Sequence, residues 1–235
     1  MSQVFVSYSH TDEAFVRLLL SDIEDLGVSV WIDLKLDIGD SLILRISDAI
    51  QASDFLIACL SKTSVKSNWV KKELAVATTM GINGNRVFVL PLLLAGIEQS
   101  DIPLFLADLL CADFREPASY DRAFNRLIRR IQSEAIGKDS EGEHFRPPTV
   151  LRLGLRRVYR LVDTARNPAM NDWVVSYLAT GLQGPARRPD PTERYWSYIA
   201  LGKIRGDIAK SLITEGLDDE NEWARKGARE AWREP

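Results

Sequence analysis

Runs of consecutive apolar residues alternate with amphipathic segments over the first 136 positions of the chain. Continuous apolar runs predict strands buried on both faces, whereas apolar residues spaced three or four apart predict helices. We therefore predict five strands, at residues 4–9, 28–33, 54–61, 87–94 and 106–112. Strand–helix alternation of this kind predicts an α/β fold with a parallel sheet covered on both faces.

Two of the predicted helices can be delimited in the sequence. Gly27 stops an amphipathic helix that begins near Thr11, and a further amphipathic helix is predicted from Tyr120 to Glu134. In open parallel sheets, ligands bind beyond the carboxyl ends of the strands. Three candidate site residues lie at these ends: Ser9, His10 and Asp33.

Beyond the sheet region, the chain changes composition. Residues 137–149, GKDSEGEHFRPPT, have the small, charged and Pro-rich composition of a linker. Residues 150–235 lack strand-like runs and are predicted to be all-helical. The predicted organisation is thus an α/β domain at 1–136, a linker at 137–149 and a small all-α domain at 150–235.

Residues 193–233 resemble a HEAT-like helical repeat. They predict three helices, separated by a turn at Gly206-Asp207 and a break at Asp218-Asp219. Ala200-Leu201-Gly202 resembles the end of a repeat helix, and Asp219 and Arg225 have the spacing of the polar pair that recurs between repeats.

Charge and cysteine usage exclude several classes of function. The net charge is −3, with 13 Lys and Arg against 18 Asp and Glu over residues 1–136, so we expect no nucleic-acid binding. Cys59 and Cys111 lie in apolar runs and are predicted to be buried free thiols of a reduced compartment. Cys and His residues show no zinc spacing, so we expect no metal site.

The apolar runs also bear on localisation. The N-terminus lacks the pattern of a signal peptide, and the longest apolar run, Val87 to Ile97, contains Pro91 and is too short for a membrane span. We expect a soluble, cytoplasmic protein with no membrane partner.

The stretch SNWVKKEL, residues 67–74, places a carboxylate on an apolar helix face. At about 100° per residue, Glu73 falls about 40° from Trp69, whereas Lys71 and Lys72 point away toward solvent. A desolvated carboxylate is unfavourable without compensation. Glu73 is therefore either a structural group held by hydrogen bonds or a catalytic group in a cleft beside Trp69.

Residues 3–135 resemble a TIR (Toll/interleukin-1 receptor) domain, which has a flavodoxin-like fold. The residues that carry the resemblance are Val4 to Ser9, Trp31-Ile32-Asp33, Gly39, Ile46, Ala49, Ile50, Ser53, Leu60-Ser61, Ser67, Trp69, Glu73-Leu74 and Pro91. The chain departs from the common pattern at Val65 and Val70, which are both expected to be packing positions.

The resemblance implies an activity and a set of site residues. Many TIR domains cleave the nicotinamide–ribose bond of NAD+, and the carboxylate of their W-x-x-x-E pattern corresponds to Glu73. Trp69, Ser9, His10 and Asp37 correspond to other residues of the family's pocket. The resemblance thus implies an NAD+ nucleosidase that uses NAD+ as substrate and needs no cofactor.

The chemistry suits these residue types. Pyridinium is a good leaving group, and a carboxylate near the ribose can stabilise the oxocarbenium-like transition state, while an indole can stack on a flat ring. Either hydrolysis or cyclisation to a cyclic ADP-ribose product is compatible with these residues.

Two other interpretations remain open. Gly39 to Leu42 spell the GDSL esterase block, but the two histidines, His10 and His144, lack the context of a catalytic base, and Ser41 suits a helix cap better. Alternatively, the chain is a non-catalytic scaffold that mediates protein–protein interaction.

By family analogy we expect homo-oligomerisation through TIR domains, a protein partner or trigger at the helical domain, and a role in antiviral immune defence. We hypothesise that assembly completes the NAD+ site.

Overall fold

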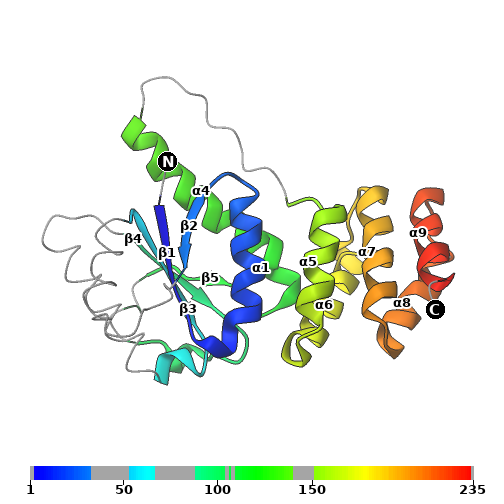
Figure 1. Cartoon of the computed structure of the whole chain (residues 1–235), viewed down its shortest axis with the longest axis horizontal. Helices are drawn as coiled ribbons and strands as arrows, with labels where there is room; N and C mark the ends of the chain where they lie inside the picture. Colours follow the sequence, from blue (N-terminus) through cyan, green and yellow to red (C-terminus); the bar gives the residue numbers. More distant parts are fainter. Residues whose placement is uncertain are drawn as a thin grey trace, which may run out of the picture. The chain divides into compact units, whose positions relative to one another are not determined.

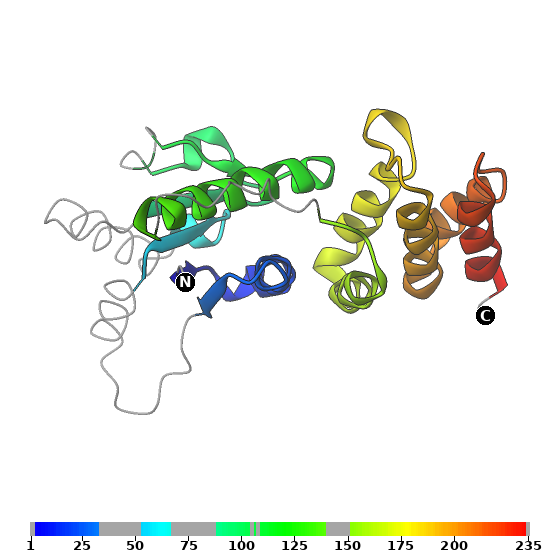
Figure 2. The ribbon, with the colours of Figure 1, turned by 90° about the horizontal axis from the view of Figure 1, so that it is seen from above.

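The computed structural model of the chain describes residues 3–32, 53–66, 88–103, 106, 109–139 and 151–233. The chain divides into two compact units, Met1–Val150 and Leu151–Pro235. We call them the sheet unit and the helical unit, and Figures 1 and 2 show the elements of each.

The sheet unit contains five parallel strands, as predicted. Their order is β2-β1-β3-β4-β5, and every neighbouring pair is parallel. This order is that of flavodoxin-like folds, so the predicted fold class is confirmed. The strands span Gln3–Ser7 (β1), Ser29–Ile32 (β2), Phe55–Leu60 (β3), Phe88–Leu93 (β4) and Ala112–Asp113 (β5).

Two helices, α1 (Glu13–Glu24) and α4 (Tyr120–Asp139), pack together on one face of the sheet. The rings of Phe15 and Tyr120 lie 6.1 Å apart, edge to face, and the Tyr120 hydroxyl donates to Asp22 at 2.9 Å. Gly27, with φ of 78°, follows α1 as predicted. The α4 helix ends later than predicted and runs three residues into the predicted linker.

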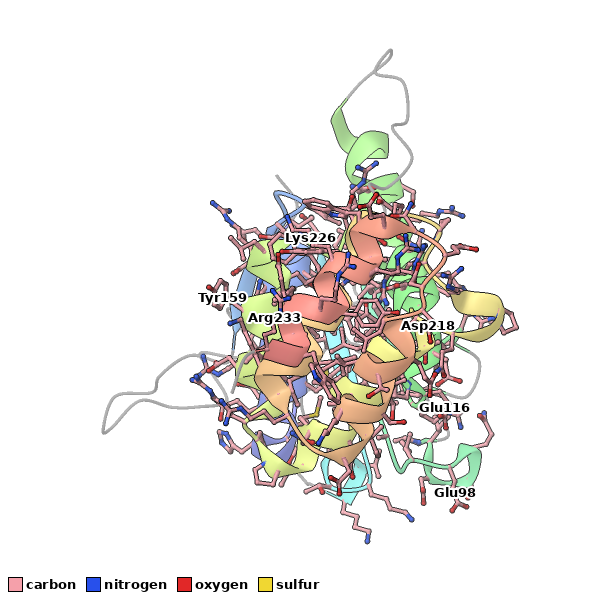
Figure 3. All side chains as sticks on the ribbon, turned by 90° about the vertical axis from the view of Figure 1, so that its right-hand side faces the viewer. Glu98, Glu116, Tyr159, Asp218, Lys226 and Arg233 are labelled. Carbon is pink, nitrogen blue, oxygen red and sulfur yellow. The ribbon has the colours of Figure 1, made fainter. Side chains whose placement is uncertain are left out.

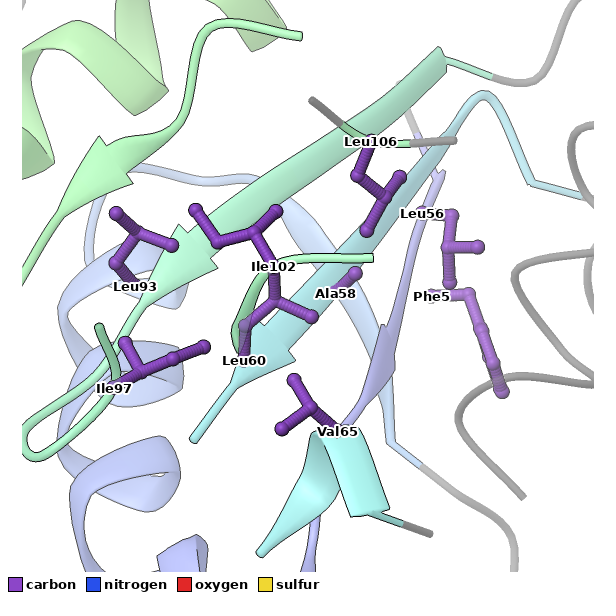
Figure 4. Packing of buried hydrophobic residues seen from close by; sticks show 9 residues of the cluster. All are labelled: Phe5, Leu56, Ala58, Leu60, Val65, Leu93, Ile97, Ile102 and Leu106. Atoms are coloured by element: carbon purple, nitrogen blue, oxygen red, sulfur yellow. The ribbon is translucent and has the colours of Figure 1, made fainter. Parts of the chain in front are cut away.

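The opposite face of the sheet carries a compact apolar cluster, shown in Figure 4. Because side chains alternate along a strand, Leu56, Ala58 and Leu60 of β3 all point to this face. The residues that close the cluster, Val65, Ile97, Ile102 and Leu106, lie outside the strands and outside the described α-helices. The cluster comprises Phe5, Leu56, Ala58, Leu60, Val65, Leu93, Ile97, Ile102 and Leu106.

The fifth strand was predicted wrongly. The predicted range was 106–112, but the strand is only Ala112–Asp113. The backbone N–H of Leu109 donates to the carbonyl of Leu106 at 3.0 Å, which is a turn and not an extended strand. Leu110 is 87% exposed, so the apolar run that suggested a buried strand is in part a surface loop.

The helical unit consists of helices α5 to α9 with one short 3-10 turn, η6 (Gly184–Ala186), which confirms its all-helical character. Asn167 and Asp190 cap α6 and α7 by accepting hydrogen bonds from backbone N–H groups two residues later, with proline at the first helical position in both cases. The helices span Leu155–Ala165 (α5), Pro168–Thr180 (α6), Pro191–Ile204 (α7), Asp207–Gly216 (α8) and Glu222–Arg233 (α9).

Small residues allow α7 and α9 to pack closely. A Cβ atom on Gly202 would lie 2.9 Å from the Cβ of Ala231, and one on Gly227 would lie 2.8 Å from the Cα of Tyr195. The three predicted helices of 193–233 are therefore confirmed, whereas their identity as a HEAT-like repeat stays a prediction.

A buried carboxylate, Asp219, joins α7 to the segment between α8 and α9. Arg194 donates to it twice, from Nε and Nη2, both at 3.0 Å, and Arg187 donates at 3.1 Å. The predicted partner Arg225 does contact Asp219, but its guanidinium donates to the backbone carbonyl at 2.5 Å. The side-chain pair is therefore Asp219 with Arg194, not Asp219 with Arg225.

Both cysteines are free thiols, as predicted. Only Cys59 is buried, whereas Cys111 is half-buried beside the exposed leucines that precede β5. Among the helices that the structure describes, none is long and apolar enough to cross a bilayer.

Candidate functional site

The predicted site residues divide into two groups. Ser9 and His10 lie just beyond the carboxyl end of β1, at the sheet edge where ligands bind in such folds. The remaining predicted residues lie outside the described part of the chain: Glu73, Trp69, Asp37 and Asp33. Of the predicted site residues, the structure therefore describes only Ser9 and His10.

The turn after β1 is held by local hydrogen bonds. It forms a 3-10 turn, η1 (His10–Asp12), in which the backbone N–H of Asp12 donates to the carbonyl of Ser9 at 2.7 Å. The hydroxyls of Ser9 and Thr11 are 3.0 Å apart. His10 is exposed, and its ring meets that of Tyr8 edge to face at 6.5 Å. The imidazole and the two hydroxyls are thus presented at the sheet edge.

A side-chain hydrogen bond connects this turn to the neighbouring strand. The Ser61 hydroxyl donates to Asp12 Oδ2 at 2.6 Å, across 49 residues of sequence. The register of β1 and β3 explains the contact: Ser7 lies opposite Ala58, so both strands end at the same edge. Asp12 therefore fixes the β1 turn against the end of β3.

The residues that follow β3 are held by further hydrogen bonds to Ser61. Ser61 and Ser64 exchange hydrogen bonds: the Ser61 N–H donates to Ser64 Oγ at 2.8 Å, and the Ser64 N–H donates to Ser61 Oγ at 3.1 Å. The Ser64 hydroxyl also donates to the carbonyl of Cys59 at 2.8 Å. These bonds fix the 3-10 turn η2 (Ser64–Lys66), which directly precedes residue 67 in the sequence.

The environment of Asp12 makes it a chemically distinctive group. Burial raises the pKa of its carboxyl above the ordinary value, although hydrogen bonds with Ser61, Thr11 and Ser9 act in the opposite direction. Burial also raises the pKa of the Cys59 thiol, and the Asp12 charge adds to this effect. A half-buried carboxyl with a raised pKa at a ligand-binding edge can hold or transfer a proton.

Sequence reasoning missed Asp12 as a site residue. The sequence pattern places Asp12 at the start of the helix that begins near Thr11 and gives it no role in the site. The available signal was its position: an acidic residue in the turn that follows the first strand of a parallel sheet. The described residues include no group of three or more His, Cys, Asp and Glu side chains able to hold a metal ion.

Comparison with known proteins identifies the sheet unit. The family model described as "TIR domain" matches residues 4–128. The 2′ cyclic ADP-D-ribose synthase AbTIR of Acinetobacter baumannii is 34% identical over 91 residues, which cover 38% of this chain and 34% of that protein. The NAD(+) hydrolase TcpC of Escherichia coli is 29% identical over 90 residues, which cover 37% of this chain and 29% of that protein.

The chain thus matches only about a third of the length of these curated relatives. Among solved structures, the TIR domain of the Toll-related receptor TRR-2 of Hydra magnipapillata is similar, with 22% identity and a TM-score of 0.46. That likeness covers 55% of this chain and 97% of the receptor domain. Because the family model takes in more than half of the sequence, the chain belongs to the TIR domain family.

Proposed function

We propose that the sheet unit cleaves the nicotinamide–ribose bond of NAD+, with Glu73 as the catalytic carboxylate. The observation that carries the proposal is the alignment of this unit with relatives named as a 2′ cyclic ADP-D-ribose synthase and an NAD(+) hydrolase. NAD+ is the substrate, and the reaction needs no other cofactor or metal.

The reaction breaks the bond between C1′ of the ribose and the pyridinium nitrogen. The bonding electrons leave with the nitrogen, so nicotinamide departs as a neutral molecule and requires no proton. The positive charge that develops on the ribose is stabilised by the carboxylate of Glu73, and Trp69 stacks on a flat ring of the substrate. Water then attacks C1′ in hydrolysis, or a hydroxyl of the same molecule attacks in cyclisation, and the nucleophile releases its proton.

The proposal includes two further roles, one in substrate binding and one in positioning. We assign Ser9 and His10, together with Asp33 and Asp37, to substrate binding. Asp12 serves as a positioning residue, because its bond from Ser61 links the turn that carries Ser9 and His10 to the end of β3. Ionised Asp12 also adds negative potential at an edge where a positive charge develops during the reaction.

Product analysis of NAD+ turnover by the full-length protein tests the proposal. Replacement Glu73→Ala should lower the rate of nicotinamide release by about 10²- to 10⁴-fold, the usual range for loss of a catalytic or charge-stabilising group. Glu24→Ala is the matched control, because exposed Glu24 ends α1, which runs from the carboxyl edge of the sheet back to the opposite edge. Wild-type turnover in Glu73→Ala would refute the assignment and favour a non-catalytic scaffold.

The proposal extends to assembly. TIR domains of neighbouring copies would complete the NAD+ site, and the helical unit would receive a protein partner that triggers assembly in antiviral immune defence. The resemblance to the TIR family supports this extension. Turnover per protomer should then rise with protein concentration, in parallel with the mass measured by light scattering. Constant turnover per protomer over a change in oligomeric state would argue against it.

A further inference from the structure

Two cavities of the helical unit meet at the end of α7. The first, of about 770 Å³, is lined by α5, the start of α6 and the end of α7. The second, of about 480 Å³, is lined by α7, α8 and α9. Gly202 and Arg205 line both cavities, so the two lie on either side of the end of α7. We call this feature the α7 groove.

The α7 groove is predominantly basic. Arg166, Lys203, Arg205 and Lys210 line it, against the single carboxylate of Asp207. Arg166 also contacts Asp163 at 3.2 Å, but this pair is fully at the surface, where such contacts contribute little and rearrange readily. The basic lining favours a negatively charged occupant.

Exposed aromatic side chains lie at both cavities. Tyr159 lines the first and is 57% exposed, and Trp232 lines the second and is 47% exposed. The Nζ atom of Lys210 lies 5.5 Å from the centre of the Trp232 ring. Figure 3 shows Tyr159 projecting at the edge of the unit. Large exposed aromatic groups beside cations suit an occupant with both apolar and acidic groups.

The backbone at the centre of the groove is strained. Arg205 has φ of 66° and ψ of −176°, a region that is essentially restricted to glycine. A glycine at position 205 would adopt this conformation without strain, as Gly206 does with its φ of 102°. Strained residues of this kind concentrate at binding sites. Because the exposed Arg205 lines both cavities, its side chain is placed to contact an occupant of either one.

We propose that the α7 groove binds an acidic peptide segment of a partner protein. Carboxylates of the peptide pair with Lys203, Arg205 and Lys210, and its apolar side chains pack on Tyr159 and Trp232. Two open cavities that share Gly202 and Arg205 can hold different side chains of one peptide at separate positions. The net charge of −3 lacks the overall positive field of a nucleic-acid binder.

This inference rests on the proposed partner at the helical unit and is independent of NAD+ cleavage. A display library of random peptides, selected on the full-length protein, tests it directly. Selected peptides should be enriched in Asp and Glu with at least one aromatic or large aliphatic residue. The best peptide, labelled with a fluorophore, should bind more weakly as salt concentration rises.

Two double variants locate the binding surface. Lys203→Glu with Lys210→Glu should weaken binding of the selected peptide at least tenfold. Arg152→Glu with Arg229→Glu makes the same change in net charge at exposed positions outside both cavities, and should leave affinity within about twofold. Thermal unfolding of each variant checks that the helical unit remains folded.

Arg205→Gly separates a binding role from a structural one. It should raise the thermal midpoint of the helical unit, because it relieves the strained backbone, while weakening peptide binding several-fold. A residue with a purely structural role would change the midpoint and leave the affinity unchanged.

Three results would overturn the proposal. The first is a set of selected peptides that is not enriched in Asp and Glu. The second is equal affinity of the best peptide for wild type and for the Lys203/Lys210 variant. The third is tighter binding at the groove by a single-stranded oligonucleotide or by ADP-ribose than by any selected peptide. Because binding is measured without NAD+, loss of turnover in Glu73→Ala and failure of peptide binding are separate outcomes.

Discussion

The buried ion pair of the helical unit makes a quantitative prediction for Asp219→Ala. Asp219 accepts two hydrogen bonds from Arg194 at 3.0 Å, one from Arg187 at 3.1 Å and one from the backbone N–H of Asn221 at 2.9 Å. The side chains of Asp219 and Arg194 are 2% and 3% exposed, respectively. Removal of the carboxylate therefore leaves the buried guanidinium with only the exposed carboxylate of Glu220, 3.6 Å away, as a counter-charge.

The expected loss is large relative to the stability of a small domain. Breaking a buried pair by removing one partner costs about 3–5 kcal/mol, because the remaining charge stays desolvated. The exposed Glu220 offsets only part of this cost, because water screens its charge. Arg194 keeps two hydrogen bonds from Nη1 to the carbonyls of Arg188 and Pro189, which favours the lower half of that range. Domains are stable by about 5–15 kcal/mol in total, so Asp219→Ala should remove a substantial part of the stability of the helical unit.

Urea unfolding of the full chain, followed by tryptophan fluorescence, measures this effect. The helical unit holds four of the six tryptophans, Trp173, Trp196, Trp223 and Trp232, so its transition dominates the signal. Asp218→Ala, at the exposed neighbouring position labelled in Figure 3, should change the unfolding free energy by less than about 0.5 kcal/mol. A loss below about 1 kcal/mol in Asp219→Ala would refute the reasoning.

The pair with Arg194 also predicts a coupling and a pH dependence. Arg194→Met combined with Asp219→Ala should destabilise less than the sum of the single variants, because no uncompensated charge remains. Burial acts to raise the pKa of Asp219, but hydrogen bonds from Arg194, Asn221 and Arg187 outweigh it and hold the pKa below its ordinary value. The stabilisation is therefore present above the unfolded-state pKa and is lost as pH falls through the lower native-state pKa.

Two further predictions concern other contacts. Gly227→Val should lower the unfolding free energy of the helical unit by about 1–3 kcal/mol, measured by urea titration, because a Cβ at this position would lie 2.8 Å from the Cα of Tyr195. The control Arg229→Val, at an exposed position of the same helix, should have little effect. Asp12→Asn should stabilise the sheet unit near neutral pH, because the raised native pKa of Asp12 means that folding disfavours its ionised carboxylate. This advantage should disappear in acid, where Asp12 is protonated in both the folded and the unfolded state. Equal thermal midpoints of wild type and variant at all pH values would contradict this prediction.

The strands of the sheet were predictable where burial is uniform. All six residues of β3 are buried, so an uninterrupted apolar run specified the strand without ambiguity. The strand prediction at residues 106–112 was wrong because the leucines in this run have different environments. Leu106 is buried in the apolar cluster, whereas Leu110 lies on the surface. Hydrophobicity alone does not separate a buried strand from a turn with one buried anchor.

Contacts between distant residues were the part that pattern reasoning missed. The spacing of Asp219 and Arg225 identified a real contact but the wrong acceptor atom, because the carboxylate bonds to Arg194, 25 residues earlier. The bond of Asp12 with Ser61 likewise depends on the register of two parallel strands. Such pairs follow from packing, which local sequence spacing does not encode.

Asp12 and Asp219 show how environment separates a candidate functional carboxylate from a structural one. Both are shielded from water and accept charge-assisted hydrogen bonds, yet the pKa of Asp12 is raised and that of Asp219 is lowered. Asp219 has two arginines that compensate for its burial, whereas the side chains that bond to Asp12, Ser61 and Thr11, are neutral hydroxyls. A carboxylate that folding leaves without a compensating charge gains most from a positive charge that arrives later. At the edge of the sheet, the developing charge on the ribose of NAD+ would supply it, and a kcat that falls with little change in KM in Asp12→Asn would be its signature.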